Sequence, residues 1–478
     1  MTTNAATDSR PADMASMREA IAAGRTTPAA LVERAIERAE AVNTELNFIA
    51  WPNFERARVE AVAPRTGPLA GVPTLIKDMI MEKGVPASWG AAALRDFIAP
   101  DDAPYTRAIN GAGLISIARS AMPELGLNVV TESPLVGVTR NPWSLDHTPG
   151  GSSGGGSAAV AAGVVPVAHA SDGLGSIRHG AAPCGLVGLK PSRGRNIGDE
   201  ALRSIADLNV NGCVSRTVRD TAAWLEATQT RVPEAAFAPV PLVTAPVDSR
   251  LHIHAFSAVM RTGADPDASV GRVFANTIGL LERLGHRVGD GLLPFDAPDA
   301  IEALHLITEG MFSRRLGVLS DQIGIAVGAG DLEYRSKTLV EQGNGIADED
   351  YDAAWRRMEK NVAAYLDMLT GIDIWMTPTF STEIVRVGVF GPDTSWSEQR
   401  DHLVDYAGYC WIDNFAGSPS ISLPMGFSDN GLPVGIQFAT RPGGEALLLS
   451  LAYQLENAVE WWRHKPPVWV GGSEAAFL

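Results

Sequence analysis

The chain has 478 residues, of which 45% are hydrophobic and 20% are charged, as in ordinary folded globular proteins. Its formal net charge of -16 makes nucleic acids and anionic membrane surfaces poor partners. Three cysteines without a CxxC pair give no disulfide framework. The N-terminal residues contain no apolar core of a signal peptide, and no apolar run approaches the length of a membrane span. We therefore expect a cytoplasmic protein that binds neither membranes nor nucleic acid.

Helices and short apolar strands alternate along the first third of the chain. We predict a disordered tail over residues 1–12 and a single domain over residues 13–478. Thr27 and Pro28 are typical of a helix start, and the apolar run before Lys77 is typical of a buried strand. The predicted elements are a helix from Thr27 to Asn43, a helix over 53–63, a strand over 69–78, a helix over 102–113 and a strand over 114–119.

The same alternation continues to the C-terminus. Two glycine-rich turns, over 150–156 and 172–176, interrupt the apolar segments of the central region. The remaining predicted elements are a helix over 157–163, strands over 164–168 and 185–189, a helix over 267–284, a strand over 372–376, paired strands over 419–424 and 432–438, and a helix over 445–459. This order predicts a layered α/β domain.

The first glycine-rich turn, Gly150 to Gly156, has several interpretations. It could be a flexible linker or an anion-binding turn at the start of a helix. It also contains a literal GxSxG around Ser152, which suggests the nucleophile elbow of α/β-hydrolases. That elbow follows a hydrophobic strand, however, whereas this turn follows the polar segment 144–149.

Several strings of the sequence together resemble the amidase signature family. They are GVPTLIKD, GGSSGG, DGLGSIR, CGLVGLKPSRGR, ISLPMGF and LPVGIQF, and the resemblance runs from about residue 13 to residue 455. It implies a layered α/β/α fold with a large mixed central sheet covered by helices. It also implies a core motif region over 69–195 and a more variable substrate-loop region over about 196–350.

By this resemblance, the chain carries a Ser–cis-Ser–Lys triad. Ser176 would be the nucleophile, Ser152 the bridging serine after a cis peptide bond with Gly151, and Lys77 the base. A lysine must be desolvated to act as a neutral base, which suits the apolar residues before Lys77. Candidate oxyanion donors are the backbone N–H groups of Gly173, Leu174, Gly175 and Ser176. The implied supporting residues are Gly151, Ser153, Ser171, Asp172 and Arg178.

The sequence departs from the family pattern at two places. Leu174 stands where the family usually has glycine in the oxyanion turn. His179 and Gly180 follow Arg178, where the family often has an apolar residue and proline. These departures affect the expected shape of the site wall and not the expected triad.

The resemblance implies an amidase acting on a small-molecule amide or carbamate, as a monomer or homodimer, without cofactor or metal. His252 and His254 form an HxH pair with no evident further ligand. Within the family, the chain resembles nylon-oligomer cyclic-dimer hydrolases, and aryl-carbamate urethanases share the chemistry. The alternative is the glutaminase subunit of a tRNA-dependent amidotransferase. We expect substrate loops over 197–211 and 311–348.

Overall fold

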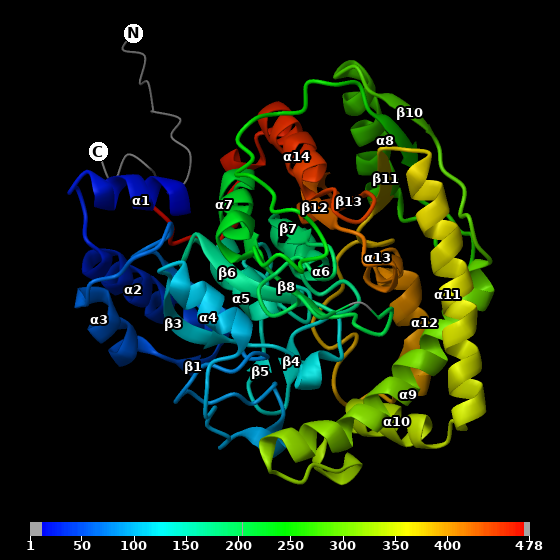
Figure 1. The fold of residues 1–478 in the computed structure, drawn as a ribbon, viewed down its shortest axis with the longest axis horizontal. Helices are drawn as coiled ribbons and strands as arrows, with labels where there is room; N and C mark the ends of the chain where they lie inside the picture. The colour runs from blue at the N-terminus through cyan, green and yellow to red at the C-terminus, as the bar shows by residue number, and fades with distance from the viewer. Residues whose placement is uncertain (1–11, 203, 473–478) are drawn as a thin grey trace.

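The computed structural model describes residues 12–202 and 204–472, so most of the predicted tail lies outside the described residues. A mixed eight-stranded sheet forms the centre, in the order β10-β9-β11-β13-β12-β7-β8-β6 (Figure 1). β9 pairs in parallel with β10 and β11, and the other pairs are antiparallel. Its strands are β6 (Val167–Asp172), β7 (Val187–Lys190), β8 (Val210–Ser215), β9 (His252–Ala255), β10 (Arg287–Asp290), β11 (Ile374–Pro378), β12 (Ser420–Phe427) and β13 (Pro433–Ala439).

Helices cover both faces of this sheet, which confirms the predicted α/β/α layers. On one face, α7 (Val218–Thr228), α8 (Ala268–Arg283) and α14 (Glu445–Val459) share a hydrophobic core with β7, β9, β11, β12 and β13. On the other face, α5 (Gly154–Ala161) and α6 (Arg178–Ala181) pack on β6 and β8. α13 (Trp411–Ala416) packs on this second face beside Trp375 of β11.

A smaller sheet, in the order β1-β3-β2, joins the edge of the large one. Its strands are β1 (Ile49–Pro52), β2 (Pro73–Lys77) and β3 (Ile115–Ser120). The Thr74 hydroxyl donates to the Val167 carbonyl at 2.9 Å, and the Lys77 N–H donates to His169 Nδ1 at 3.2 Å. These bonds hold β2 against β6 and bring the end of β2 to the centre of the molecule.

The other helices surround this core. α9, α10 and α11 form a wall at the lower right of Figure 1, and α1 to α4 lie on the opposite side. They are α1 (Met14–Ala22), α2 (Pro28–Leu46), α3 (Phe54–Val62), α4 (Pro104–Gly111), α9 (Ala297–Ile323), α10 (Tyr334–Asn344), α11 (Asp348–Thr370) and α12 (Trp396–Ala407). Two short strands, β4 (Glu132–Ser133) and β5 (Gly137–Val138), pair with each other. No helix in the described ranges has the length and apolarity to span a bilayer.

Most predicted helices and strands overlap the observed ones, with ends that differ by a few residues. α2 continues past Asn43 to Leu46, because the Asn43 side chain accepts the N–H groups of Phe48 and Ile49 beyond the helix end. β6 covers 167–172 instead of 164–168, because buried polar residues extend it. The expected loop over 311–348 is largely helical, in α9 and α10.

Candidate active site

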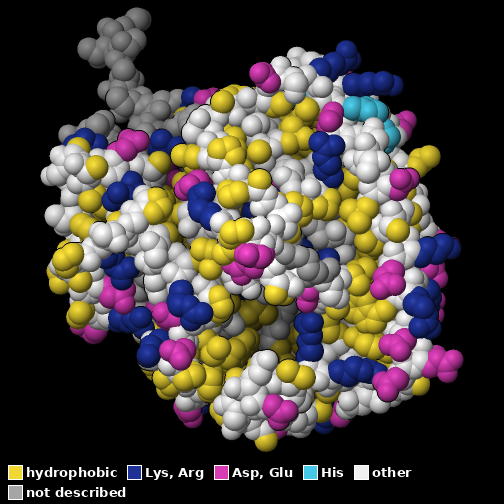
Figure 2. Space-filling view, viewed as in Figure 1, with side chains coloured by type: hydrophobic (Ala, Val, Ile, Leu, Met, Phe, Trp, Pro, Cys, Tyr) yellow, Lys and Arg dark blue, Asp and Glu magenta, His cyan; other side chains and the backbone are white. Residues whose placement is uncertain are grey.

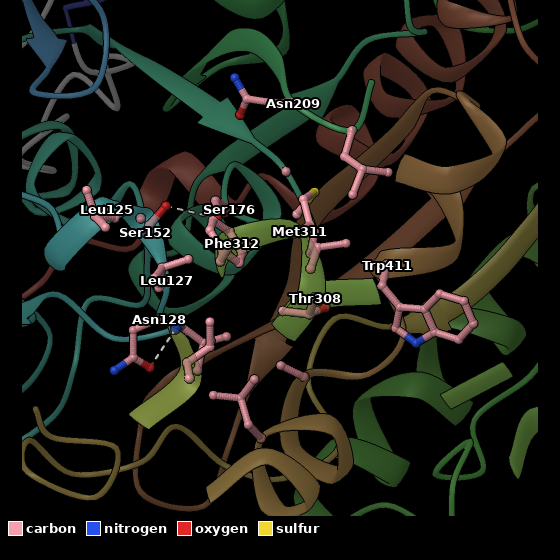
Figure 3. A pocket seen from close by; sticks show the side chains of 18 of the residues that line it. Leu125, Leu127, Asn128, Ser152, Ser176, Asn209, Thr308, Met311, Phe312 and Trp411 are labelled. Carbon is pink, nitrogen blue, oxygen red and sulfur yellow. Dashed lines mark hydrogen bonds between the residues drawn. The ribbon is translucent and has the colours of Figure 1, made fainter. Parts of the chain in front are cut away.

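Three side chains from separate segments meet at the centre of the molecule. Lys77 ends β2, Ser152 lies in the first glycine-rich turn, and Ser176 lies in the turn between β6 and α6. Lys77 Nζ lies 2.7 Å from Ser152 Oγ, and Ser152 Oγ lies 3.0 Å from Ser176 Oγ (Figure 3). The structure thus brings the three triad candidates into one continuous hydrogen-bonded chain.

The first glycine-rich turn is packed tightly against its neighbours, so it is not a flexible linker. Gly150 has φ +81°, and a Cβ atom there would lie 1.9 Å from the His179 carbonyl oxygen. A Cβ atom on Gly151 would lie 2.6 Å from the Val130 carbonyl oxygen. The Gly151–Ser152 peptide bond is cis, as the family resemblance implied. Glycine at these positions lets the turn present Ser152 toward Lys77.

Burial sets the protonation state of Lys77. The side chain is fully buried, and desolvation lowers the pKa of its ammonium from 10.5 to about 7. The nearby Asp172 carboxylate opposes this shift without cancelling it. A substantial neutral fraction therefore exists near pH 7, as a general base requires.

Two further serines fix the orientation of the Lys77 amine. Lys77 Nζ lies 3.1 Å from Ser153 Oγ and 3.0 Å from Ser171 Oγ. The Ser153 hydroxyl donates to the Ser171 carbonyl at 3.2 Å, and the Ser171 hydroxyl donates to Met79 Sδ at 3.0 Å. Both hydroxyl oxygens are thus left to accept the two N–H groups of a neutral amine. The one lone pair of Lys77 then faces Ser152.

The nucleophile turn is held by the Asp172 carboxylate. Asp172 accepts the N–H groups of Gly175 at 2.7 Å and of Ile177 at 3.1 Å. The predicted oxyanion role of the Gly175 N–H is therefore wrong, because that donor is already used. The N–H groups of Gly173, Leu174 and Ser176 donate to no acceptor within the described parts of the chain. They remain the candidate oxyanion donors.

Arg178 forms a buried ion pair with Asp172. Its Nε and Nη2 atoms lie 3.0 and 2.9 Å from the Asp172 carboxylate oxygens. Desolvation alone would raise the pKa of the Asp172 carboxyl, but the Arg178 guanidinium outweighs it and holds that pKa below its ordinary value. Arg178 also donates to Asp413 at 3.0 Å, to Asn414 at 2.6 Å and to Gln437 at 2.8 Å. None of these last three residues was predicted from the sequence.

We expect Asp172→Asn to lower the free energy of unfolding by about 3 kcal/mol, because it breaks a fully buried ion pair. It also weakens the anchor of the Gly175 turn, so activity should fall as well. Urea denaturation measures the first effect. Asp146→Asn is the matched control, since the Asp146–Arg386 pair is exposed and should cost less than about 1 kcal/mol. Equal losses in the two variants would contradict the bracing role.

The triad opens into a pocket of about 190 Å³. Hydrophobic side chains gather in a hollow on the face shown in Figure 2. In Figure 3, Leu125 and Leu127 lie on one side of Ser176, and Trp411 lies on the far side of Thr308 and Met311. The lining comes from the 125–129 loop, the nucleophile turn, the 208–209 segment, α9, α10 and α12. Both segments expected to carry substrate loops therefore contribute to it.

The two departures from the family pattern both lie in the wall of this pocket. The His179 ring packs against Gly175 and lies 5.0 Å from the ring of Phe380. Desolvation, with the Arg178 charge, lowers the pKa of His179 to about 3, so the ring is neutral at working pH. Leu174 adds an apolar side chain beside Ser176.

Residues suited to a metal ion do not gather in the described parts of the chain. No group of three or more His, Cys, Asp or Glu side chains there has the arrangement of a metal site. His252 and His254 lie in β9 with ring centroids 4.8 Å apart. His169 packs inside the core, where its ring joins β2 to β6.

The chain is similar to proteins of a known family. A family model described as amidase matches residues 30–449. The chain is 38% identical over 477 residues to "Putative amidase AmiC" of Mycobacterium tuberculosis, covering 95% of this chain and 96% of the other. It is 30% identical over 489 residues to "6-aminohexanoate-cyclic-dimer hydrolase" of Paenarthrobacter ureafaciens, covering 95% and 96%.

Solved structures agree with these sequence matches. A structure of 6-aminohexanoate cyclic dimer hydrolase with substrate superposes with a TM-score of 0.87 at 28% identity, covering 96% of this chain and 99% of that one. A bacterial aryl acylamidase superposes with a TM-score of 0.84 at 23% identity, covering 95% and 98%, which shows the shared fold. The chain belongs to the amidase signature family and is an amide hydrolase.

Proposed function

We propose that the chain hydrolyses amide bonds through an acyl-enzyme on Ser176. The observation that carries this proposal is the unbroken hydrogen-bonded chain from Lys77 through Ser152 to Ser176, at the wall of a pocket. A serine hydroxyl is a poor nucleophile until a base takes its proton. The neutral Lys77 amine accepts a proton from Ser152, which in turn takes the proton of Ser176.

The first half-reaction forms the acyl-enzyme. Ser176 Oγ attacks the substrate carbonyl carbon, and the carbonyl π electrons move onto oxygen. The N–H groups of Gly173, Leu174 and Ser176 face no other acceptor and stabilise this oxyanion, each by about 3 kcal/mol in the transition state. The protonated relay then gives its proton to the leaving nitrogen as the C–N bond breaks. A water molecule repeats the sequence at the ester carbonyl and restores Ser176.

The substrate class follows from the lining and from the relatives. The mainly apolar wall suits amides and anilides with bulky uncharged groups. Relatives named as a cyclic-dimer hydrolase and an aryl acylamidase point to the same range. Carbamates present a similar carbonyl and are included. The glutaminase alternative is not favoured, because glutamine is small and polar whereas the pocket wall is mainly apolar.

The proposal is tested with a nitroanilide, an aryl carbamate and a nitrophenyl ester. We expect all three to react, and the ester to give a burst of nitrophenol followed by a slower steady state, because deacylation becomes limiting. Mass spectrometry of the quenched burst should find one acyl group, on the peptide that contains Ser176. An acyl group on another residue, or none during turnover, would overturn the covalent mechanism.

A further inference from the structure

The charge of the pocket wall differs from that of the chain as a whole. The chain has 55 acidic and 39 basic residues. Among the described residues that line the pocket, however, none is Asp or Glu, and Arg315 is the one lysine or arginine. Lys77 lies just behind Ser152 and adds positive charge whenever it is protonated. The residues described as lining the pocket therefore do not share the net negative charge of the chain.

Two acidic residues that adjoin the part of this wall formed by α9 and α12 are paired with cations. Glu309 is buried and accepts a hydrogen bond from Arg400 at 2.8 Å. Asp401 lies 3.8 Å from His305 Nδ1 and is shared with Arg261 and Arg400, at 3.6 and 4.0 Å. These carboxylates are already satisfied by cations of the protein. They offer no partner to a positively charged group of a substrate.

Arg315 stands at the solvent end of the stripe that α9 contributes to the pocket. Leu304, Thr308, Met311 and Arg315 recur at intervals of three or four residues, so they share one side of the helix. Arg315 is exposed, and its Nη2 atom donates to the Ala206 carbonyl at 3.2 Å. That bond uses one of the five guanidinium N–H groups and holds the charge between α9 and the neighbouring segment.

We propose that this pocket selects amides that are uncharged or carry a carboxylate, with the carboxylate pairing with Arg315, and that it rejects amides that carry an ammonium group. The inference rests on the proposed function and defines its substrate class. An ammonium group inside the pocket would lose its hydration without gaining a carboxylate partner. A carboxylate at the far end of an apolar chain would meet a guanidinium suited to bidentate binding.

Three p-nitroanilides of equal chain length test this selection: hexanoyl, adipoyl with a free carboxylate, and 6-aminohexanoyl. At about pH 8, where Lys77 is mostly neutral, the release of nitroaniline is followed by absorbance. We expect kcat/KM for the ammonium substrate to be about 100-fold below that of the hexanoyl substrate, because a buried unpaired charge is costly. The carboxylate substrate should equal or exceed the hexanoyl one.

The variant Arg315→Gln assigns the effect to one side chain. It should lower kcat/KM for the carboxylate substrate about 10-fold more than kcat/KM for the hexanoyl substrate, as expected for the loss of one hydrogen bond to a charged group. Arg314→Gln is the matched control, because Arg314 lies next on α9 but pairs with Asp348 outside the pocket. Equal turnover of all three substrates, or an unchanged carboxylate preference in Arg315→Gln, would overturn the inference alone. No turnover of any substrate would overturn the proposed function with it.

Discussion

Replacing Ser176 by alanine is expected to lower kcat for a chromogenic anilide by about 10⁴-fold or more, with little change in folding or in substrate binding. The hydroxyl supplies the attacking oxygen, and no other group of the hydrogen-bonded chain can replace it, since Ser152 Oγ is engaged with Lys77. Ser176 is only half-buried, and the loss of its hydroxyl opens no large cavity. Steady-state kinetics measure the rate, and urea denaturation measures the folding.

Ser157→Ala is the matched control for this variant. Ser157 lies in the same serine-rich segment, and its hydroxyl donates to the Ser153 carbonyl instead of to the triad. We expect its kcat to stay within about threefold of the wild type and its stability to fall by about 1 kcal/mol. A Ser176→Ala enzyme that retained more than a tenth of the activity would refute the nucleophile assignment, whatever the control did.

The three triad candidates could be picked out from the sequence because each lies in a short local motif. Lys77 follows an apolar strand, and the two serines lie in glycine-rich turns, so the chemistry is visible in a few consecutive residues. The use of the Gly175 N–H by Asp172 was not visible in the same way. Which N–H groups of a turn remain free depends on the turn's conformation, and glycine content alone does not fix it.

The partners of Arg178 illustrate what the sequence could not predict. Asp413 and Asn414 lie in α13, more than 230 residues further along the chain, within a segment of ordinary helical composition. Only the packing of α13 on the sheet brings them to the site. The pocket wall formed by α9 and α12 has the same origin, because apolar residues on a helix do not reveal whether they face a core or a cavity. Trp396 and Trp411 face the pocket, whereas Trp375 is buried in the core.

The protonation of Lys77 gives the second large effect. Because its pKa lies at about 7, the neutral fraction increases tenfold per pH unit well below that value and levels off above it. We expect kcat/KM of the wild type to follow this curve. Lys77→Met keeps most of the side-chain volume and removes the base, so it should lower kcat/KM by about 10³- to 10⁴-fold and abolish the inflection near pH 7. Initial rates from about pH 5 to pH 9 measure both.

A second buried lysine requires a control. Desolvation, with the Arg178 charge, also lowers the pKa of Lys190 to about 7, but its Nζ atom donates to the Pro191 carbonyl at 3.0 Å and does not touch the triad. Lys190→Met should therefore keep the inflection near pH 7, whatever its absolute rate. His169 and His179 cannot produce it, because burial lowers the pKa of each to about 3. If the inflection survived in Lys77→Met and vanished in Lys190→Met, Lys190 and not Lys77 would be the group that titrates near pH 7, and the prediction would be wrong.

The pH dependence of the free energy of unfolding is a second, independent measure of the Lys77 pKa. The folded protein lowers the pKa of Lys77 below the 10.5 of an unfolded lysine, so the unfolded chain binds more protons between about pH 7 and pH 10.5. The stability of the wild type relative to Lys77→Met should therefore rise with pH across that window and stay constant below it. Below pH 7 the folded protein bears the full cost of a buried ammonium. Urea denaturation of both proteins at about pH 6 and pH 9 measures the difference in stability. A difference that is the same at both pH values would mean that Lys77 stays charged in the folded enzyme.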